Sequence, residues 1–234
     1  MRDGVDAVQR MLARLLPSAA CSAVVAVDER AVDERAVDDD GLHPGEAAVV
    51  ADAVEKRRRE FAAGRRAARI ALGALGVVFD RPLLPDADRV PCWPPAVRGS
   101  ITHSARLAAA CVIDATRARG IGVDVDDDDA LDDELWPIVL TPAERDALPR
   151  TAAAMGLSAG TCARLHFCAK ESVYKCVFPL VRVTFDFTDV DVEFAPHGDS
   201  FVARVRKAGA APDEPLRGRW GRAAQHVAAA TTWP

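Results

Sequence analysis

Two short segments carry carboxylates and lysines at spacings that could support chemistry. In the first, Gly120–Asp126, alternation along a strand would place Asp124 and Asp126 on the same side, about 6.6 Å apart along the chain. Two carboxylates that face the same way repel each other unless they are protonated or bridged by a cation. This strand is therefore expected to end in carboxylates that are either protonated or bridged by a cation.

The acidic run that starts at Asp124 does not fit a calcium-binding EF-hand loop. The sixth position of such a loop would be Asp129, where a glycine is needed. Its twelfth position would be Leu135, where the loop needs a glutamate. The sequence therefore excludes an EF-hand here.

The second segment is Phe167-Cys-Ala-Lys-Glu-Ser-Val-Tyr-Lys175, in which Glu171 and Lys175 are one helical turn apart and share a face. Alone, such a pair is more typical of an exposed ion pair that stabilises a helix by roughly 0.2–0.5 kcal/mol. Combined with the first segment, the three carboxylates could hold one Mg²⁺, and a lysine one turn away would lie where a phosphate binds. The combination predicts metal-assisted phosphoryl transfer.

Two further features could supply cations for phosphate groups. The run Lys56–Arg59 continues to Arg65, Arg66 and Arg69 along a predicted helix, a pattern equally typical of a solvated basic face. In Gly99–Ser104, His103 stands at a strand end between hydroxyl residues, where a structural and a functional role are equally open.

Composition limits the class of protein. The chain has 234 residues, half of them hydrophobic and 28% charged, enough to form one large domain or two small ones. Its net charge of −5 argues against nucleic acid as a partner. We expect no membrane segment, because no apolar run approaches about 20 residues, and no secretory signal, because the N-terminus is acidic and polar. Six cysteines without a CxxC pair suggest reduced thiols in a cytoplasmic protein.

The pattern of the whole chain predicts mixed helices and strands in both halves. Residues 45–76 look helical, with Gly64 and Gly73 as points that could divide them into two helices. A five-residue repeat over residues 26–40 is assigned no function. Strands are expected at 20–27, 98–104, 106–114, 119–125, 190–194, 201–206 and 224–232, and helices at 140–148 and 161–177. We therefore expect an α+β protein with two lobes, residues 1–118 and 119–234.

The two chemical segments together resemble the signature motifs of 4′-phosphopantetheinyl transferases, of the two-lobed type that serves surfactin and enterobactin synthesis. Other blocks resemble the same family in the right order, and the resemblance covers roughly residues 44–222. These blocks are Arg57-Arg-Arg-Glu-Phe61 with Arg65, Pro91-Cys-Trp-Pro94, Gly99-Ser-Ile-Thr-His-Ser104, Leu140-Thr-Pro-Ala-Glu-Arg145 and Phe178-Pro-Leu180.

The resemblance implies a pseudo-symmetric α+β fold that binds coenzyme A between two lobes. It implies transfer of the 4′-phosphopantetheine arm from coenzyme A to a serine of an acyl or peptidyl carrier protein, with release of adenosine 3′,5′-bisphosphate. The carrier would belong to polyketide or nonribosomal peptide synthesis, and the enzyme would be a monomer.

The resemblance also implies a role for each matched residue. Asp124, Asp126 and Glu171 would bind Mg²⁺, for which Mn²⁺ could substitute, and Glu171 would also be the base for the carrier serine. Lys170 and Lys175 would contact phosphates or neutralise the leaving group. The coenzyme A phosphates would be held by Arg57, Arg65, Thr102 and His103.

Two departures from the family pattern keep other functions open. Asp126 stands where the family usually has glutamate, and residues 83–90 are acidic apart from Arg89, where the family usually offers lysines and glycines. A non-catalytic homologue that only binds coenzyme A is one alternative. A metal-dependent nucleotide hydrolase that uses the same carboxylates is the other.

Overall fold

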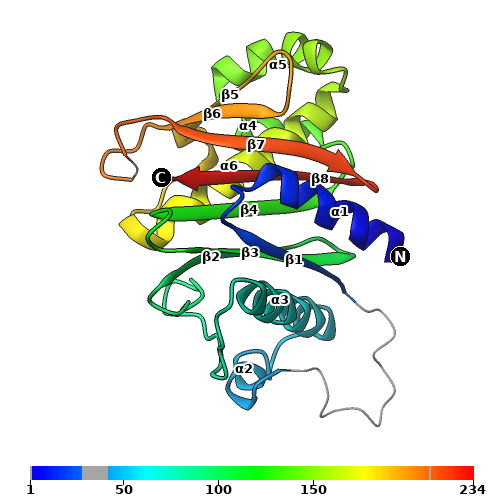
Figure 1. Ribbon diagram of the computed structural model, residues 1–234. Coiled ribbons are helices and arrows are strands. Elements are labelled where there is room, and N and C mark those ends of the chain that lie inside the picture. The colour runs from blue at the N-terminus through cyan, green and yellow to red at the C-terminus, as the bar shows by residue number, and fades with distance from the viewer. Residues whose placement is uncertain (1, 28–41, 211) are drawn as a thin grey trace.

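The computed structural model describes residues 2–27, 42–210 and 212–234, so most of the five-residue repeat lies outside the described residues. Both halves of the chain contain helices and strands (Figure 1). In order they are α1 (Arg2–Leu15), β1 (Cys21–Ala26), α2 (Pro44–Val49), α3 (Glu55–Ala74), β2 (Val97–His103), β3 (Leu107–Asp114), β4 (Gly120–Asp127), η1 (Asp133–Leu135), α4 (Trp136–Val139), α5 (Pro142–Met155), α6 (Ala159–Val181), η2 (Phe187–Asp189), β5 (Val190–Phe194), β6 (Ser200–Val205), β7 (Leu216–Ala223) and β8 (His226–Trp233).

The strands form two antiparallel sheets, with orders β1-β3-β2 and β4-β8-β7-β6-β5. Both sheets share one connectivity. A first strand (β1 or β4) is followed by a long helix (α3 or α6), and a later hairpin (β2–β3 or β7–β8) returns its last strand to pair with the first. This arrangement confirms the predicted α+β fold with two pseudo-symmetric halves.

Helix α3 differs from its prediction in the position where the helical stretch is interrupted. The break between helices falls at residues 50–54, and α3 then continues through both Gly64 and Gly73. The reason at Gly64 is packing, because a Cβ there would lie 3.0 Å from the side chain of Ile101 on β2. The predicted division at the two glycines is therefore wrong, and Gly64 instead lets the helix approach its sheet.

Helix α6 lies directly on β4. A Cβ at Gly122 would fall well inside the contact distance of the Ser172 carbonyl oxygen, and one at Gly120 would do the same against Cys176. Glycine at alternate positions thus gives the helix a flat strand face to lie on. This contact fixes how far the acidic end of β4 stands from the side chains of α6.

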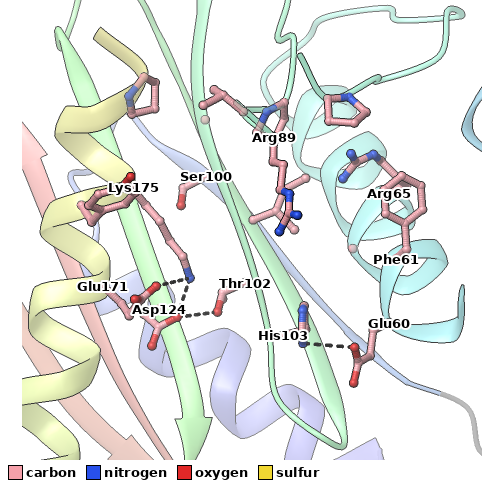
Figure 2. Close-up of a pocket in the computed structure, with 18 of the residues that line it drawn as sticks. Glu60, Phe61, Arg65, Arg89, Ser100, Thr102, His103, Asp124, Glu171 and Lys175 are labelled. Atoms are coloured by element: carbon pink, nitrogen blue, oxygen red, sulfur yellow. Dashed lines mark hydrogen bonds and ion pairs between the residues drawn. The ribbon is translucent and has the colours of Figure 1, made fainter. Parts of the chain in front are cut away.

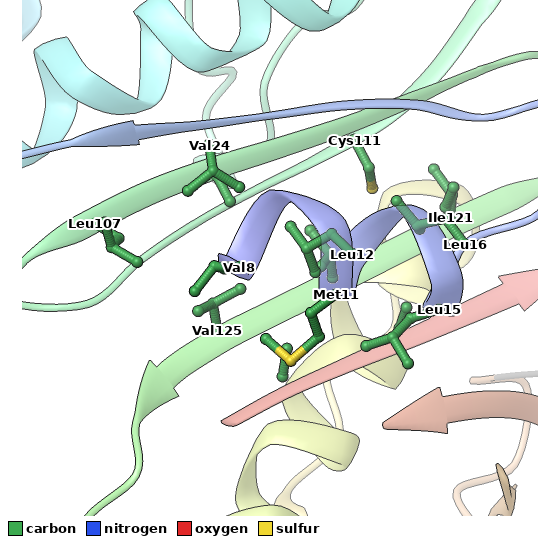
Figure 3. Close-up of a cluster of buried hydrophobic side chains, with 14 of the residues drawn as sticks. Val8, Met11, Leu12, Leu15, Leu16, Val24, Leu107, Cys111, Ile121 and Val125 are labelled. Carbon is green, nitrogen blue, oxygen red and sulfur yellow. The ribbon is translucent and has the colours of Figure 1, made fainter. Parts of the chain in front are cut away.

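Apart from short helical turns, two elements were not predicted. Strand β7 carries exposed arginines and two glycines, which mask its strand pattern, although Gly218 packs closely on Phe201. Helix α1 lies across the junction of the two sheets (Figures 1 and 3). Its apolar face packs into one buried cluster with residues of both sheets; the helix contributes Val8, Met11, Leu12 and Leu15, and the strands contribute Val24, Cys111, Ile121 and Val125. Among the described residues, no helix is long and apolar enough to cross a bilayer.

Candidate active site

A cleft of about 990 Å³ opens between the two halves of the fold, bounded by α3 and β2 on one side and by β4 and α6 on the other (Figure 2). It gathers all but one of the residues to which the family resemblance assigns a role. These are Arg57, Arg65, Thr102, His103, Asp124, Asp126, Glu171 and Lys175.

The centre of the acidic side is the carboxylate of Asp124, which is 5% exposed. Its Oδ1 accepts hydrogen bonds from the Lys175 ammonium at 2.6 Å and from the Thr102 hydroxyl at 2.8 Å. Lys175 Nζ also lies 3.7 Å from Glu171 Oε2. One ammonium from α6 therefore bridges the carboxylate of β4 and the carboxylate one turn back on its own helix.

Burial and neighbouring charges shift the pKa values of the two α6 groups in this contact, Glu171 and Lys175. Burial raises the pKa of Glu171, and the nearby Asp124 carboxylate raises it further, against the opposing effect of Lys175. Burial alone would lower the pKa of Lys175, but Asp124 and Glu171 raise it above its ordinary value. The lysine is thus charged, and the glutamate is a stronger base than an exposed one.

Asp126 lines the same cleft but has a different partner. Its Oδ2 accepts a hydrogen bond from Arg164 at 2.8 Å. Sequence reasoning missed Arg164, although it stands seven residues before Glu171 and hence two turns away on the same face of α6. In this conformation Asp126 is neutralised by an arginine and is not part of the contact between Asp124 and Lys175.

The opposite, basic side of the cleft is built on α3 and the end of β2. Arg57 Nη1 lies 2.9 Å from His103 Nε2, and His103 Nδ1 lies 3.8 Å from Glu60 Oε2. Because the arginine can only donate, Nε2 accepts and the ring carries its proton on Nδ1, toward Glu60. Burial lowers the pKa of His103, and the positive charges of Arg57 and Lys175 lower it further, so the ring is neutral near pH 7.

Arg65 is almost fully buried in the wall of the cleft. Its Nε donates to the Leu83 carbonyl at 2.7 Å, and its guanidinium lies over the Phe61 ring, 4.1 Å from the centroid. Burial lowers its pKa to about 10. Arg65 therefore ties α3 to the loop that closes the cleft while keeping a positive charge at its surface.

In that loop, residues 83–90, the acidic side chains have a structural partner. Arg182, at the C-terminal end of α6, lies 2.7 Å from the Asp86 carboxylate and 2.9 Å from that of Asp88. The acids thus fasten the loop to the other half of the molecule. Arg89, the residue after Asp88, has a positive φ of 66° and points into the cleft (Figure 2).

Lys170 is the predicted site residue that the structure does not bring to the cleft. Its side chain is 1% exposed, and its ammonium donates to Glu144 at 2.5 Å and to the carbonyls of Val139 and Phe187. Glu144 in turn accepts from the amide of Val192 at 2.7 Å. The expectation that Lys170 meets phosphate from this position is wrong, because successive helical residues point about 100° apart and Lys170 faces the packed side of α6.

Comparisons with known proteins identify the family of the chain. A family model described as the 4′-phosphopantetheinyl transferase N-terminal domain matches residues 45–113, and one described as the 4′-phosphopantetheinyl transferase superfamily matches residues 120–230. The chain belongs to the 4′-phosphopantetheinyl transferase superfamily.

Individual members of this superfamily are similar over most of the chain. The 4′-phosphopantetheinyl transferase PptT of Mycobacterium tuberculosis is 38% identical over 185 residues, which cover 76% of this chain and 79% of that protein. The 4′-phosphopantetheinyl transferase Svp of Streptomyces mobaraensis is 38% identical over 198 residues, or 83% and 76%. The corresponding enzyme Npt of Nocardia iowensis is 34% identical over 192 residues, or 76% and 83%. This chain is an enzyme of the phosphopantetheinyl transferase family.

The buried position of Lys170 leads to a stability prediction. Lys170→Met leaves the Glu144 carboxylate buried without its partner, so the free energy of unfolding should fall by about 3–5 kcal/mol in urea denaturation. Adding Glu144→Gln should recover part of the loss. The control is Lys56→Met, which removes an ion pair to Glu60 from an exposed position and should change stability by less than about 0.5 kcal/mol. Unchanged stability with lost activity would instead place Lys170 in contact with substrate.

Proposed function

We propose that this transferase moves the 4′-phosphopantetheine arm of coenzyme A to a serine of an acyl or peptidyl carrier protein. The observation that carries the proposal is the division of one cleft into a basic wall, with Arg57 and His103, and an acidic wall, with Asp124 and Glu171 bridged by Lys175. Coenzyme A has phosphates at both ends of its nucleotide, and the reaction needs a base near one of them. The two walls meet both requirements.

The basic wall suits the phosphates of the nucleotide. Arg57 can offer a planar pair of N–H donors to a phosphate. His103 exchanges its arginine contact for the same phosphate, and Arg65 adds positive charge from the wall behind. We assign coenzyme A binding to these three residues; Thr102 adjoins His103 on β2 but donates its hydroxyl hydrogen bond to Asp124.

The acidic wall suits the chemical step. Glu171 would accept the serine proton, directly or through a water, as the serine oxygen forms a bond to the phosphorus nearest the pantetheine arm. The bond from that phosphorus to the bridging oxygen breaks, and adenosine 3′,5′-bisphosphate leaves with the electron pair. Lys175 would neutralise the charge that develops on the leaving phosphate. The position of Glu171 in the cleft, one helical turn from Lys175, supports its assignment as the base.

Magnesium would be held by Asp124, Asp126 and Glu171, and Mn²⁺ is expected to substitute. The donor set fits in type, because carboxylate oxygens are the ligands Mg²⁺ prefers and two of these groups already converge on one cation, the Lys175 ammonium. Within the described residues, no three potential ligands already form a metal cluster, so Asp126 would have to exchange Arg164 for the ion. When bound, the ion would stabilise negative charge on the pyrophosphate.

The wider assignments rest on the family and on charge. We propose a carrier domain of polyketide or nonribosomal peptide synthesis as acceptor, a monomeric cytoplasmic enzyme, and lobes that divide between residues 118 and 119. The two halves of the cleft come from one chain, which supports a monomer.

The reaction is tested by the intact mass of an apo carrier protein after incubation with the enzyme, coenzyme A and Mg²⁺. We expect a gain of one phosphopantetheine group that EDTA abolishes. Cleavage of coenzyme A without any carrier would indicate a hydrolase. Coenzyme A binding without product on any carrier would indicate a non-catalytic homologue.

Replacing the base separates chemistry from binding. Glu171→Gln keeps the shape of the side chain but removes its proton acceptor, so kcat should fall by about 10²–10⁴-fold. The dissociation constant for coenzyme A, measured by calorimetry, should change by less than about threefold. Glu193→Gln, at the exposed position of β5, is the matched control and should leave both quantities unchanged. Equal losses of binding and turnover in Glu171→Gln would make Glu171 an anchor for the nucleotide and its metal.

The protonation of His103 reports on phosphate binding. In the free enzyme its pKa should lie below the ordinary histidine value, because burial and neighbouring cations disfavour the charged ring. A bound phosphate favours the charged ring, so the midpoint should move upward when coenzyme A is added. The test is an NMR pH titration of the imidazole with and without coenzyme A, with exposed His197 as the internal control. An unmoved midpoint would remove His103 from the phosphate site.

A further inference from the structure

The two sheets meet along their edge strands, β2 and β4, through hydroxyl side chains. Ser100 Oγ donates to the Val123 carbonyl at 3.4 Å and accepts from the Val123 amide at 3.1 Å. Two residues further along, Thr102 Oγ1 accepts from the Val125 amide at 3.2 Å. We name these contacts of Ser100 and Thr102 with β4 the hydroxyl seam. The seam satisfies backbone groups that an edge strand would otherwise leave without partners.

The two hydroxyls of the seam differ in one respect. Ser100 uses both its donor and its acceptor on the backbone of Val123. The Thr102 hydroxyl only accepts a hydrogen bond from the backbone, and it donates its own hydrogen bond to the carboxylate of Asp124 at 2.8 Å. Both hydroxyls are buried, at 4% and 3% exposure. Thr102 is thus the member of the seam that reaches a side chain of the proposed transfer site.

We propose that Thr102 is a positioning residue, which orients the Asp124 carboxylate from across the junction of the two halves. A hydroxyl has one proton, and the Thr102 hydroxyl directs it to Asp124 Oδ1. The Val125 amide donates to a lone pair of Thr102 Oγ1. Asp124 is therefore held between a neutral donor from β2 and the Lys175 ammonium from α6. This arrangement fixes the carboxylate plane before any ligand arrives.

The same geometry argues against direct phosphate contact by Thr102. Its side chain is nearly inaccessible to solvent. Turning the hydroxyl toward a ligand would break the hydrogen bond that it donates to the buried carboxylate of Asp124. Its neighbour His103 is exposed to the cleft and points to the opposite wall, because successive strand residues face opposite ways. Strand β2 thus presents one residue to each wall: His103 to the coenzyme and Thr102 to the acidic centre.

The inference rests on the proposed transferase function, and Ser100 offers the control. Thr102→Val keeps the shape of the side chain but loses both hydrogen bonds, whereas Thr102→Ser keeps the hydroxyl. Ser100→Ala loses the same kind of link between β2 and β4 without touching Asp124. Should Thr102→Val fail to fold, Thr102→Ala leaves room for a water at the Val125 amide and carries the same expectation.

Three measurements on the full chain distinguish positioning from support. In Thr102→Val, kcat should fall by about 10–100-fold, and Mn²⁺ affinity in the presence of coenzyme A, followed by electron paramagnetic resonance, should weaken by a similar factor. The KM for coenzyme A should change by less than about threefold. Thr102→Ser should recover kcat to within about threefold of wild type. Ser100→Ala should show wild-type kcat and Mn²⁺ affinity, even where thermal unfolding shows a comparable loss of stability.

Several outcomes would overturn the inference. A rise in the KM for coenzyme A with unchanged kcat and Mn²⁺ affinity would make Thr102 a direct coenzyme ligand. Equal catalytic losses in Ser100→Ala and Thr102→Val would reduce the seam to a structural support. If the wild-type enzyme itself transfers nothing, the proposed function fails, and the Mn²⁺ comparison among the variants still tests the placement of Asp124.

Discussion

Much of this molecule is arranged around one buried carboxylate that two halves of the chain hold at once. Asp124 belongs to β4 of one sheet, accepts a hydrogen bond from the Thr102 hydroxyl of the other sheet, and accepts another from the Lys175 ammonium on α6. Burying a carboxylate is unfavourable unless its oxygens are fully hydrogen-bonded, so these contacts must form together. The cleft therefore exists in its binding shape only when both sheets and α6 are in register.

The rest of the fold supplies that register from outside the cleft. On the far side of the junction, α1 packs Met11 and Leu12 into a cluster shared by both sheets. At the mouth, Arg182 fastens the loop of residues 83–90 by its two aspartates. On the remaining side, the buried pair of Lys170 and Glu144 ties α6 to α4, α5 and the middle of β5. Each contact joins segments far apart in the sequence, and together they leave the cleft walls little freedom.

The sequence predicts the centre of this site well because local periodicity is enough there. The spacing of Glu171 and Lys175 puts them on one helical face, and strand alternation brings Asp124 and Asp126 to one cleft. Prediction from the sequence fails where the partner of a residue comes from another element. Nothing near Asp126 in the chain indicates that Arg164 binds it, and nothing near Lys170 indicates that its side chain points toward Glu144. Helix α1 is a different case, since its apolar spacing is visible in the sequence and could have been predicted.

The two glycines of β4 have a consequence for how such an enzyme can change. The backbone of α6 rests on Gly120 and Gly122 without any side chain between. Substitutions at these two positions therefore cannot change the distance between the helix and the strand in small steps. The separation of Asp124 on β4 and Glu171 on α6 is therefore set by this backbone contact. Variation in the molecules that the enzyme accepts has to arise at the rim, such as the loop of residues 83–90. Mutagenesis libraries aimed at new acceptors gain from spending their diversity there and leaving β4 untouched.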